Sequence, residues 1–177
     1  MRRNAAVRIQ AKTITIETKQ RVQIFDITQE VKGFLAESEV WNGMGIVSTL
    51  HTTTAVFFTE TQDALWEDVE TFLQKLAREN GDYKHNDARF SDCERKNAAA
   101  HLRAMLLGGS LALQVEDGRL VLGQFQRIIF AELDGPRPRS LRMQFMGEGV
   151  ATRSRVLHVW DPGTGNSRAL PQNGDVG

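Results

Sequence analysis

The sequence predicts one domain of the α+β class. Segments with the alternating apolar and polar pattern of β-strands outnumber helical segments, and short turns separate neighbouring strands, as in antiparallel sheets. The chain has 177 residues, of which 41% are hydrophobic, and this is enough for a single domain with a buried core.

The composition argues against several classes of protein. Lysine plus arginine and aspartate plus glutamate number 22 each, so the net charge is zero, whereas a nucleic-acid-binding protein needs a basic surplus. No apolar run approaches the ~20 residues that span a bilayer, and the first residues lack the apolar segment of a secretory signal. Cys93 is the single cysteine, which fits a reducing compartment. We therefore expect a cytoplasmic protein without a membrane or nucleic-acid partner.

The first part of the chain is predicted to contain two strands and a helix. Residues 7–16 alternate apolar and polar side chains, and residues 22–25 form a second short apolar run. We expect these two strands to form a hairpin. Asp26 and Gln29 have the spacing of a capping box, which predicts that a helix begins at Asp26.

The next part is predicted to contain two strands and the longest helix. Asn42-Gly43 indicates a turn, and residues 45–50 and 54–59 are rich in Val, Thr and Phe, which favours strands. Residues 62–79 carry one apolar stripe with acidic residues at the start and basic residues at the end, which predicts a helix. Asn80-Gly81 is predicted to end it.

The remaining part is predicted to be mostly strands. An irregular loop over residues 82–96 precedes Asn97, which is predicted to cap a helix over residues 98–107. Four strands should follow, with Asp117-Gly118 as a hairpin turn between the first two. They are expected at residues 111–115, 120–122, 127–133 and 141–146.

A change in composition divides the chain into a folded domain and an extension. Residues 1–147 contain all of the strongly patterned segments. Residues 148–177 are rich in Gly, Arg, Ser, Asp and Pro and are predicted to be a largely irregular C-terminal extension, in which residues 156–160 could form one short strand.

Three of the four histidines lie in the central third of the chain. His51 follows a predicted strand, His85 lies in the loop, and His101 lies in the first turns of a helix. Three imidazoles with an open fourth position are typical of a catalytic zinc site. Their spacing matches no local zinc motif, so structural or surface roles stay open from the residues alone.

Two further segments are candidate ligand sites. In the segment from Glu132 to Arg139, two arginines flank a turn and could hold a phosphate or carboxylate; the alternative is a solvated turn in which they pair with Glu132 and Asp134. In Gly108-Gly109-Ser110 the glycines follow a helix, so Gly108 is predicted to be a C-cap and Ser110 a weaker substrate contact. The helix start at Asn97 is a better anion site.

Seven short motifs, in order, resemble the YjbQ family, whose members are described as secondary thiamine-phosphate synthases. The resemblance covers about residues 7–147. The motifs are His51-Thr52-Thr53-Thr54-Ala55-Val56, Tyr83-Lys84-His85, Ala100-His101-Leu102, Leu106-Leu107-Gly108-Gly109-Ser110, Asp117-Gly118-Arg119-Leu120, Gly123-Gln124-Phe125-Gln126 and Asp134-Gly135-Pro136-Arg137.

The resemblance implies a fold, an assembly and a site. The fold would be α+β, with a large, mostly antiparallel sheet and two or three helices packed against it. The assembly would be a homotrimer with sites near subunit boundaries. His51, His85 and His101 would hold a divalent metal ion, expected to be zinc. The other pocket positions would be Thr53, Glu60, Ser110, Gln126, Glu132 and Arg137.

Two departures from the family pattern concern the substrate more than the metal. The family usually has Asn-Glu where this chain has Thr59-Glu60, and Gly-Thr-Trp-Gln where this chain has Gly123-Gln124-Phe125-Gln126. Gln124 is larger than threonine and could reshape a pocket wall.

The activity implied by the resemblance is a metal-dependent transfer that joins a pyrimidine pyrophosphate to a thiazole phosphate. Arg137 would stabilise the leaving group, and Glu60 or Glu132 would orient the pyrimidine or act as a base. Thr53, Ser110 and Gln126 would contact this small phosphorylated substrate. Two alternatives stay open: a metal-assisted hydrolase, and a metal- or metabolite-binding protein without turnover.

Overall fold

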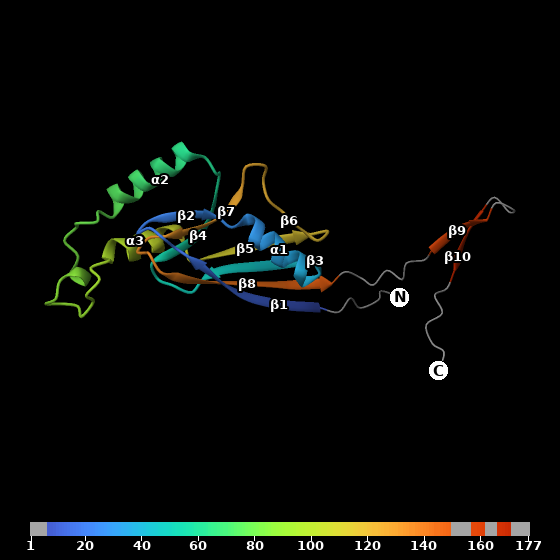
Figure 1. The fold of residues 1–177 in the computed structure, drawn as a ribbon, viewed down its shortest axis with the longest axis horizontal. Helices are drawn as coiled ribbons and strands as arrows, with labels where there is room; N and C mark the ends of the chain where they lie inside the picture. The colour runs from blue at the N-terminus through green and yellow to red at the C-terminus, as the bar shows by residue number, and fades with distance from the viewer. Residues whose placement is uncertain (1–6, 150–156, 162–165, 171–177) are drawn as a thin grey trace.

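The fold is α+β, as predicted, with two main antiparallel sheets, a separate two-stranded sheet and three α-helices in the part of the chain that the computed structural model describes (Figure 1). The described residues are 7–149, 157–161 and 166–170. The elements are β1 (Val7–Glu17), β2 (Gln23–Asp26), α1 (Thr28–Ser38), β3 (Val40–Thr49), β4 (Thr54–Thr59), α2 (Asp63–Leu76), a 3-10 turn η1 (Lys84–Asn86), α3 (Ala98–Leu107), β5 (Ser110–Glu116), β6 (Arg119–Leu120), β7 (Arg127–Glu132), β8 (Pro138–Gly149), β9 (Leu157–Asp161) and β10 (Asn166–Leu170).

The two sheets form the centre of a layered structure. The large sheet has the strand order β1-β8-β3-β5-β6 and the small sheet the order β2-β7-β4. Helix α1 and one face of the small sheet cover the large sheet, and their buried residues form one core that includes Val31, Val56, Phe130 and Phe145. The other face of the small sheet packs on α3 through Ala55, Ala100, Ala104, Ala131 and Leu133. Alternate residues of β4 and β7 therefore pack into two different hydrophobic cores, one on each face of the small sheet.

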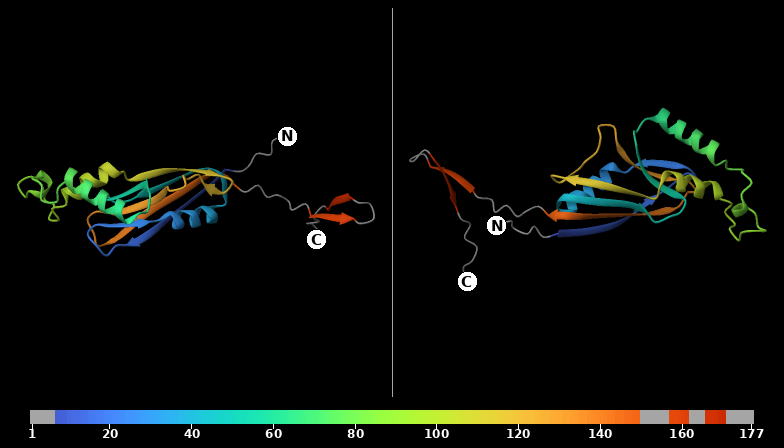
Figure 2. Two further views of the ribbon diagram at one scale, coloured as in Figure 1. Left: turned by 90° about the horizontal axis from the view of Figure 1, so that it is seen from above. Right: turned by 180° about the vertical axis from the view of Figure 1, so that it is seen from behind.

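Helices α2 and α3 and the loop between them lie together at one end of the sheets (Figures 1 and 2). Leu73 is the one buried residue of α2, and the buried side chain of Arg103 on α3 donates to the carbonyl oxygen of Ala77 just beyond the end of α2. The small residues of α3 let it approach the small sheet closely. This end of the molecule carries His85 and His101.

The predicted hairpin between the first two strands is wrong. β1 pairs along its whole length with β8, and β2 pairs with β7. Each strand was predicted from its own alternation, but pairing depends on partners more than a hundred residues away, which local patterns do not reveal.

Several predicted boundaries also differ from the structure. Asn42-Gly43 lies inside β3, where a register shift between Val40 and Asn42 replaces the turn, and a side chain on Gly43 would collide with the backbone of Met146. Helix α1 begins at Thr28, because the carboxylate of Asp26 accepts the N–H of Thr28 instead of closing a capping box. Helix α2 ends at Leu76, before the predicted stop at Asn80.

The hairpin turn at Asp117-Gly118 is confirmed. Both residues have positive φ, at 50° and 71°, and the turn joins β5 to β6. In the extension, β9 and β10 pair with each other as a separate two-stranded sheet, so its described residues form a hairpin where at most one strand was predicted. The rest of the extension lies outside the described residues. No helix in the described ranges is long and apolar enough to cross a membrane.

Candidate functional site

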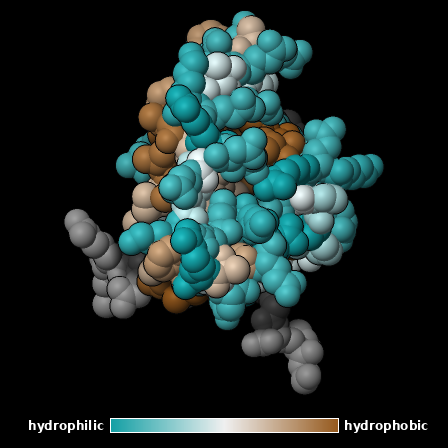
Figure 3. All heavy atoms as spheres, turned by 90° about the vertical axis from the view of Figure 1, so that its left-hand side faces the viewer, coloured by the Kyte–Doolittle hydropathy of each residue, from teal (hydrophilic) through white to brown (hydrophobic). Residues whose placement is uncertain are grey.

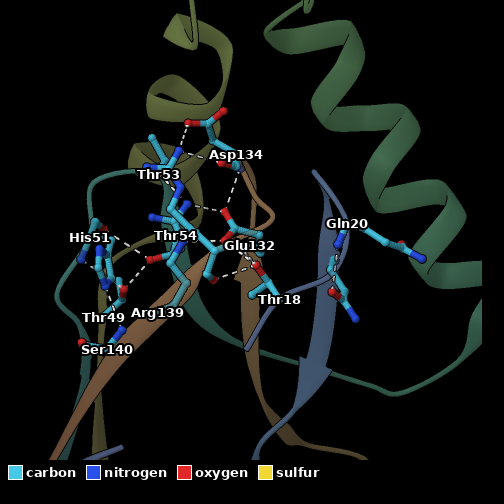
Figure 4. A network of polar contacts seen from close by, with 12 residues as sticks. Thr18, Gln20, Thr49, His51, Thr53, Thr54, Glu132, Asp134, Arg139 and Ser140 are labelled. Atoms are coloured by element: carbon cyan, nitrogen blue, oxygen red, sulfur yellow. Dashed lines mark hydrogen bonds and ion pairs between the residues drawn. The ribbon is translucent and has the colours of Figure 1, made fainter. Parts of the chain in front are cut away.

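A buried ion pair occupies the point where the small sheet meets the large one (Figure 4). Glu132, at the end of β7, is completely buried, and Arg139, at the start of β8, is 2% exposed. The arginine donates to one carboxylate oxygen through Nε and to the other through Nη2, and the same Nη2 also donates to Thr53 Oγ1 at 3.0 Å. Glu132 also accepts bonds from Thr18 Oγ1 and from the N–H of Asp134. Both oxygens are therefore occupied by protein donors.

His51 is hydrogen-bonded to β8, the strand that also carries Arg139. Its Nε2 accepts the N–H of Ser140 at 2.8 Å, so the neutral ring carries its proton on Nδ1 (Figure 4). Burial lowers the pKa of His51, and the nearby positive charge of Arg139 lowers it further. His51 thus acts in this structure as a neutral acceptor that joins the residues after β3 to β8.

A second carboxylate, Asp134, lies two residues beyond Glu132 in a different setting. It accepts bonds from Arg95 Nε at 2.9 Å and Asn97 Nδ2 at 2.7 Å, and Arg137 bonds both its side chain and its carbonyl oxygen. Arg21 lies 4.0 Å away. Burial alone raises the pKa of Asp134, but the bonds from Arg95 and Asn97 outweigh it, so the pKa lies below its ordinary value. Asp134 is an ionised group surrounded by cations.

Asn97 connects Asp134 to the histidines. Because its Nδ2 donates to Asp134, its Oδ1 faces His85 Nε2, at 3.3 Å. His85 therefore donates through Nε2, and its Nδ1 keeps a free lone pair. Asn97 is the N-cap residue of α3, whose bounds agree with the prediction, but its side chain makes no capping bond. The amide turns toward Asp134, where a charged acceptor makes the stronger bond.

His85 and His101 face one another beside a pocket. Their ring centroids are 5.1 Å apart and the rings are nearly perpendicular. The pocket, of about 480 Å³, is lined by Asp82, Tyr83, Lys84, His85, Ala98, His101 and Leu102. Burial lowers the pKa of His101, and the neighbouring His85 lowers it further, against smaller opposing effects of Asp134 and of a hydrogen bond with the backbone of Thr52. The pocket thus contains two imidazoles, of which His101 favours its neutral form.

The three-histidine metal site is only partly consistent with this arrangement. His85 and His101 each have one ring nitrogen engaged by a backbone or amide group, as metal-binding histidines usually do. His51 does not fit, because its Nε2 accepts the Ser140 N–H. Among the described residues, no group of three or more His, Cys, Asp or Glu side chains is placed to hold a metal ion. The zinc ion stays a prediction.

The other predicted site residues fall at two ends of the small sheet. Thr53, Glu132 and Arg137 lie at the histidine end, and Ser110 lies near them, where Gly109 accepts the N–H of Thr49. Glu60 follows β4 and Gln126 precedes β7. Both lie at the opposite end of the small sheet, where Thr59 pairs with Arg127. Six residues of strand separate these ends, about 20 Å. Within one chain, the structure does not bring Glu60 and Gln126 to the histidines.

Three residues of the site were missed by reasoning from the sequence. They are Thr18, which joins Glu132 to the backbone of Arg137, and Arg21 and Arg95, which bring positive charge to Asp134. No local motif contains them. The alternative reading of the arginine segment was right about pairing, since Arg137 pairs with Asp134 and Arg139 with Glu132, but wrong about solvation, because both carboxylates are buried.

Comparison with known proteins identifies relatives over most of the chain. The family model described as UPF0047 protein YjbQ-like matches residues 12–148. A UPF0047 protein of Archaeoglobus fulgidus is 44% identical over 71% of this chain and 93% of its own length. Another, from Methanothermobacter thermautotrophicus, is 39% identical over 76% of this chain and 90% of its own length.

Solved structures agree with the family and the fold. A YbjQ-like protein of unknown function from Sulfolobus solfataricus has a TM-score of 0.75 and 31% identity, covering 81% of this chain and 100% of its own. A hypothetical protein from Aeropyrum pernix has a TM-score of 0.71 and 37% identity, covering 78% of this chain and 99% of its own. The chain belongs to the YjbQ/UPF0047 family.

Proposed function

We propose that the protein is an enzyme that acts on a phosphorylated small molecule in the pocket beside His85 and His101. The observation that carries this proposal is the facing histidine pair in an open pocket, connected through Asn97 to the cation-rich surroundings of Asp134. Neutral imidazoles supply proton transfer, and the arginines attract and hold phosphate oxygens.

Each residue has a role that follows from its contacts. His85 offers Nδ1 as a base, because its Nε2–H is held by Asn97. Arg137 bonds Asp134 through one terminal nitrogen, while its buried Nε has no acceptor among the described residues, so the arginine has unused donor capacity. Glu132 is a positioning residue, because all of its bonds are made to protein donors.

The reaction to test first is the transfer expected from the family resemblance. The C–O bond between the pyrimidine methylene and its pyrophosphate breaks, and a C–N bond to the thiazole nitrogen forms, so thiamine phosphate and pyrophosphate are the products. The charge that develops on the leaving pyrophosphate favours a site with surplus cations. The arginines around Asp134 fit that requirement.

The test is an assay of the purified chain with a pyrimidine pyrophosphate and a thiazole phosphate. We expect thiamine phosphate and pyrophosphate in equal amounts, and His101→Gln should lower the rate about 100-fold, because it changes the pocket lining that positions the two substrates. His158→Gln is the matched control, since His158 lies on β9 in the separate hairpin. Equal rates in the two variants would overturn the proposal.

The same assay distinguishes the alternatives. Release of pyrophosphate without thiamine phosphate would indicate a hydrolase that uses the same pocket. A pyrimidine pyrophosphate that binds but is never consumed, with or without added zinc, would indicate a binding protein without turnover. Metal content of the wild type and of His101→Gln, measured in the same preparations, tests the predicted zinc ion separately.

We also propose that three copies assemble through the outer face of the large sheet. Ile9 pairs with Met146 and Met146 with Met44, and these side chains are 59%, 38% and 50% exposed. Ile46, 48% exposed, extends the row. A contiguous apolar sheet face of this kind favours an interface. Light scattering should give three times the 19.9 kDa chain mass, and Met44→Glu should reduce it; a wild-type monomer would contradict the trimer.

A further inference from the structure

A second pocket lies on the other side of the loop that carries His85. It has a volume of about 350 Å³ and is lined by Arg21, Glu79, Asn80, Gly81, Asn86, Arg95 and Lys96. Asn86 follows His85 directly in the 3-10 turn η1, and its side-chain oxygen accepts the N–H of Ala98 at 3.0 Å. The turn therefore separates the two pockets and is anchored to the start of α3.

The charges around this second pocket do not balance. Glu79 pairs with Arg21 and with the buried Arg103, at 3.2 Å for the latter. Asp134 is shared by Arg95, Arg137 and, at 4.0 Å, Arg21. Two carboxylates thus form ion pairs with four arginines, and Lys96 lines the same pocket. The surplus is positive although the whole chain has a net charge of zero.

The cations of the pocket are positioned before any ligand arrives. Arg95 is about half exposed, yet its Nε and a terminal nitrogen are held by the side chain and carbonyl oxygen of Asp134, at 2.9 and 3.1 Å. Arg21 is similarly half exposed and held by Glu79. An arginine held on one edge keeps its remaining N–H groups for an oxyanion, and less entropy is lost when that anion binds. The end of the molecule that carries this loop has a mainly hydrophilic surface (Figure 3).

We infer that the pocket lined by Arg21, Arg95 and Lys96 binds the phosphate or pyrophosphate group of a ligand. Three lining cations against one lining carboxylate fit a multiply charged oxyanion better than a neutral molecule or a metal ion. The histidine pocket is lined by Lys84 and His85 of the turn η1, and the anion pocket is lined by Asn86 of the same turn. The inference does not depend on turnover in the histidine pocket.

The experiment is a calorimetric titration of the full chain with inorganic pyrophosphate at low ionic strength. We expect saturable binding that weakens as salt is added. Lys96→Gln removes one direct charge contact and should weaken binding about tenfold, equal to about 1.4 kcal/mol. Arg95→Gln should weaken it at least as much, and thermal melts would show whether that variant still folds. Lys32→Gln, an exposed lysine on α1, is the matched control.

Several outcomes decide the inference. No saturable binding in the wild type, or equal affinity in Lys96→Gln and Lys32→Gln, would overturn it. Loss of pyrophosphate binding in His101→Gln but not in Lys96→Gln would also overturn it, because the anion would then sit in the histidine pocket. If a pyrimidine pyrophosphate displaces inorganic pyrophosphate, the bound group belongs to the substrate; if both bind together, a separate phosphorylated ligand uses the pocket.

Discussion

Glu132 and Asp134 lie two residues apart and are both buried, yet their surroundings differ. Glu132 forms a closed pair with Arg139, whose side chain is itself buried, and every lone pair direction is used by the protein. Asp134 is shared by arginines that are one-third to one-half exposed, and it holds them at the edge of a pocket. Breaking a saturated buried pair leaves an unpaired charge in the interior, whereas a carboxylate with surplus cations positions charge for a ligand.

The largest expected effect is on stability, through the closed pair. Glu132→Gln would leave the buried charge of Arg139 unpaired, and the free energy of unfolding should fall by about 3–5 kcal/mol. Adding Arg139→Met should restore part of the loss. Asp87→Asn is the control, since it breaks the pair with the exposed Arg89 and should cost much less than Glu132→Gln. Denaturant titrations measure all three, and equal costs for Glu132→Gln and Asp87→Asn would remove the distinction.

A smaller effect is expected at the open cluster. Asp134→Asn removes the charge that the arginines share, and the loss of its charged hydrogen bonds should cost about 1–3 kcal/mol. The variant should bind inorganic pyrophosphate more weakly than the wild type, because Arg95 loses the charged acceptor that positions it. Calorimetry on the folded variant tests this. Tighter binding would mean that Asp134 offsets the charge of the arginines more than it positions them.

The smallest effect is the dependence of stability on pH. His51 and His101 have lower pKa values in the folded chain than the ordinary 6.5. Between these values the unfolded chain binds more protons, so the free energy of unfolding falls as pH drops below about 6.5 and levels off below the folded pKa. His101→Gln should flatten part of this slope in thermal melts at several pH values. An unchanged slope would show that His101 titrates normally.

The sequence predicted the elements of the fold better than their partners. The alternation in β1, the apolar stripe of α2 and the Asp117-Gly118 turn are local signals, and each corresponds to a real element. The pairing of β1 with β8 depends on residues far apart in the chain, and the predicted first hairpin failed for that reason. Register is set by which faces become buried together.

The candidate site shows the same limit. Resemblance to the family singled out His85, His101 and Arg137, which the structure places near Asp134. Asn97 occupies the predicted cap position of α3, yet its side chain joins Asp134 to His85, residues that are distant in the chain. Contacts of this kind depend on the assembled fold, so spacing along the sequence does not reveal them.

The most direct test of the account is to map the amide chemical-shift changes that a pyrimidine pyrophosphate causes in the isotope-labelled chain. We predict that these changes concentrate in the loop and helix over residues 82–103 and in the turn at 134–137, around the histidine pair and the arginine cluster. Changes confined to residues 59–60 and 123–126, at the opposite end of the small sheet, would contradict it and return the site to Glu60 and Gln126.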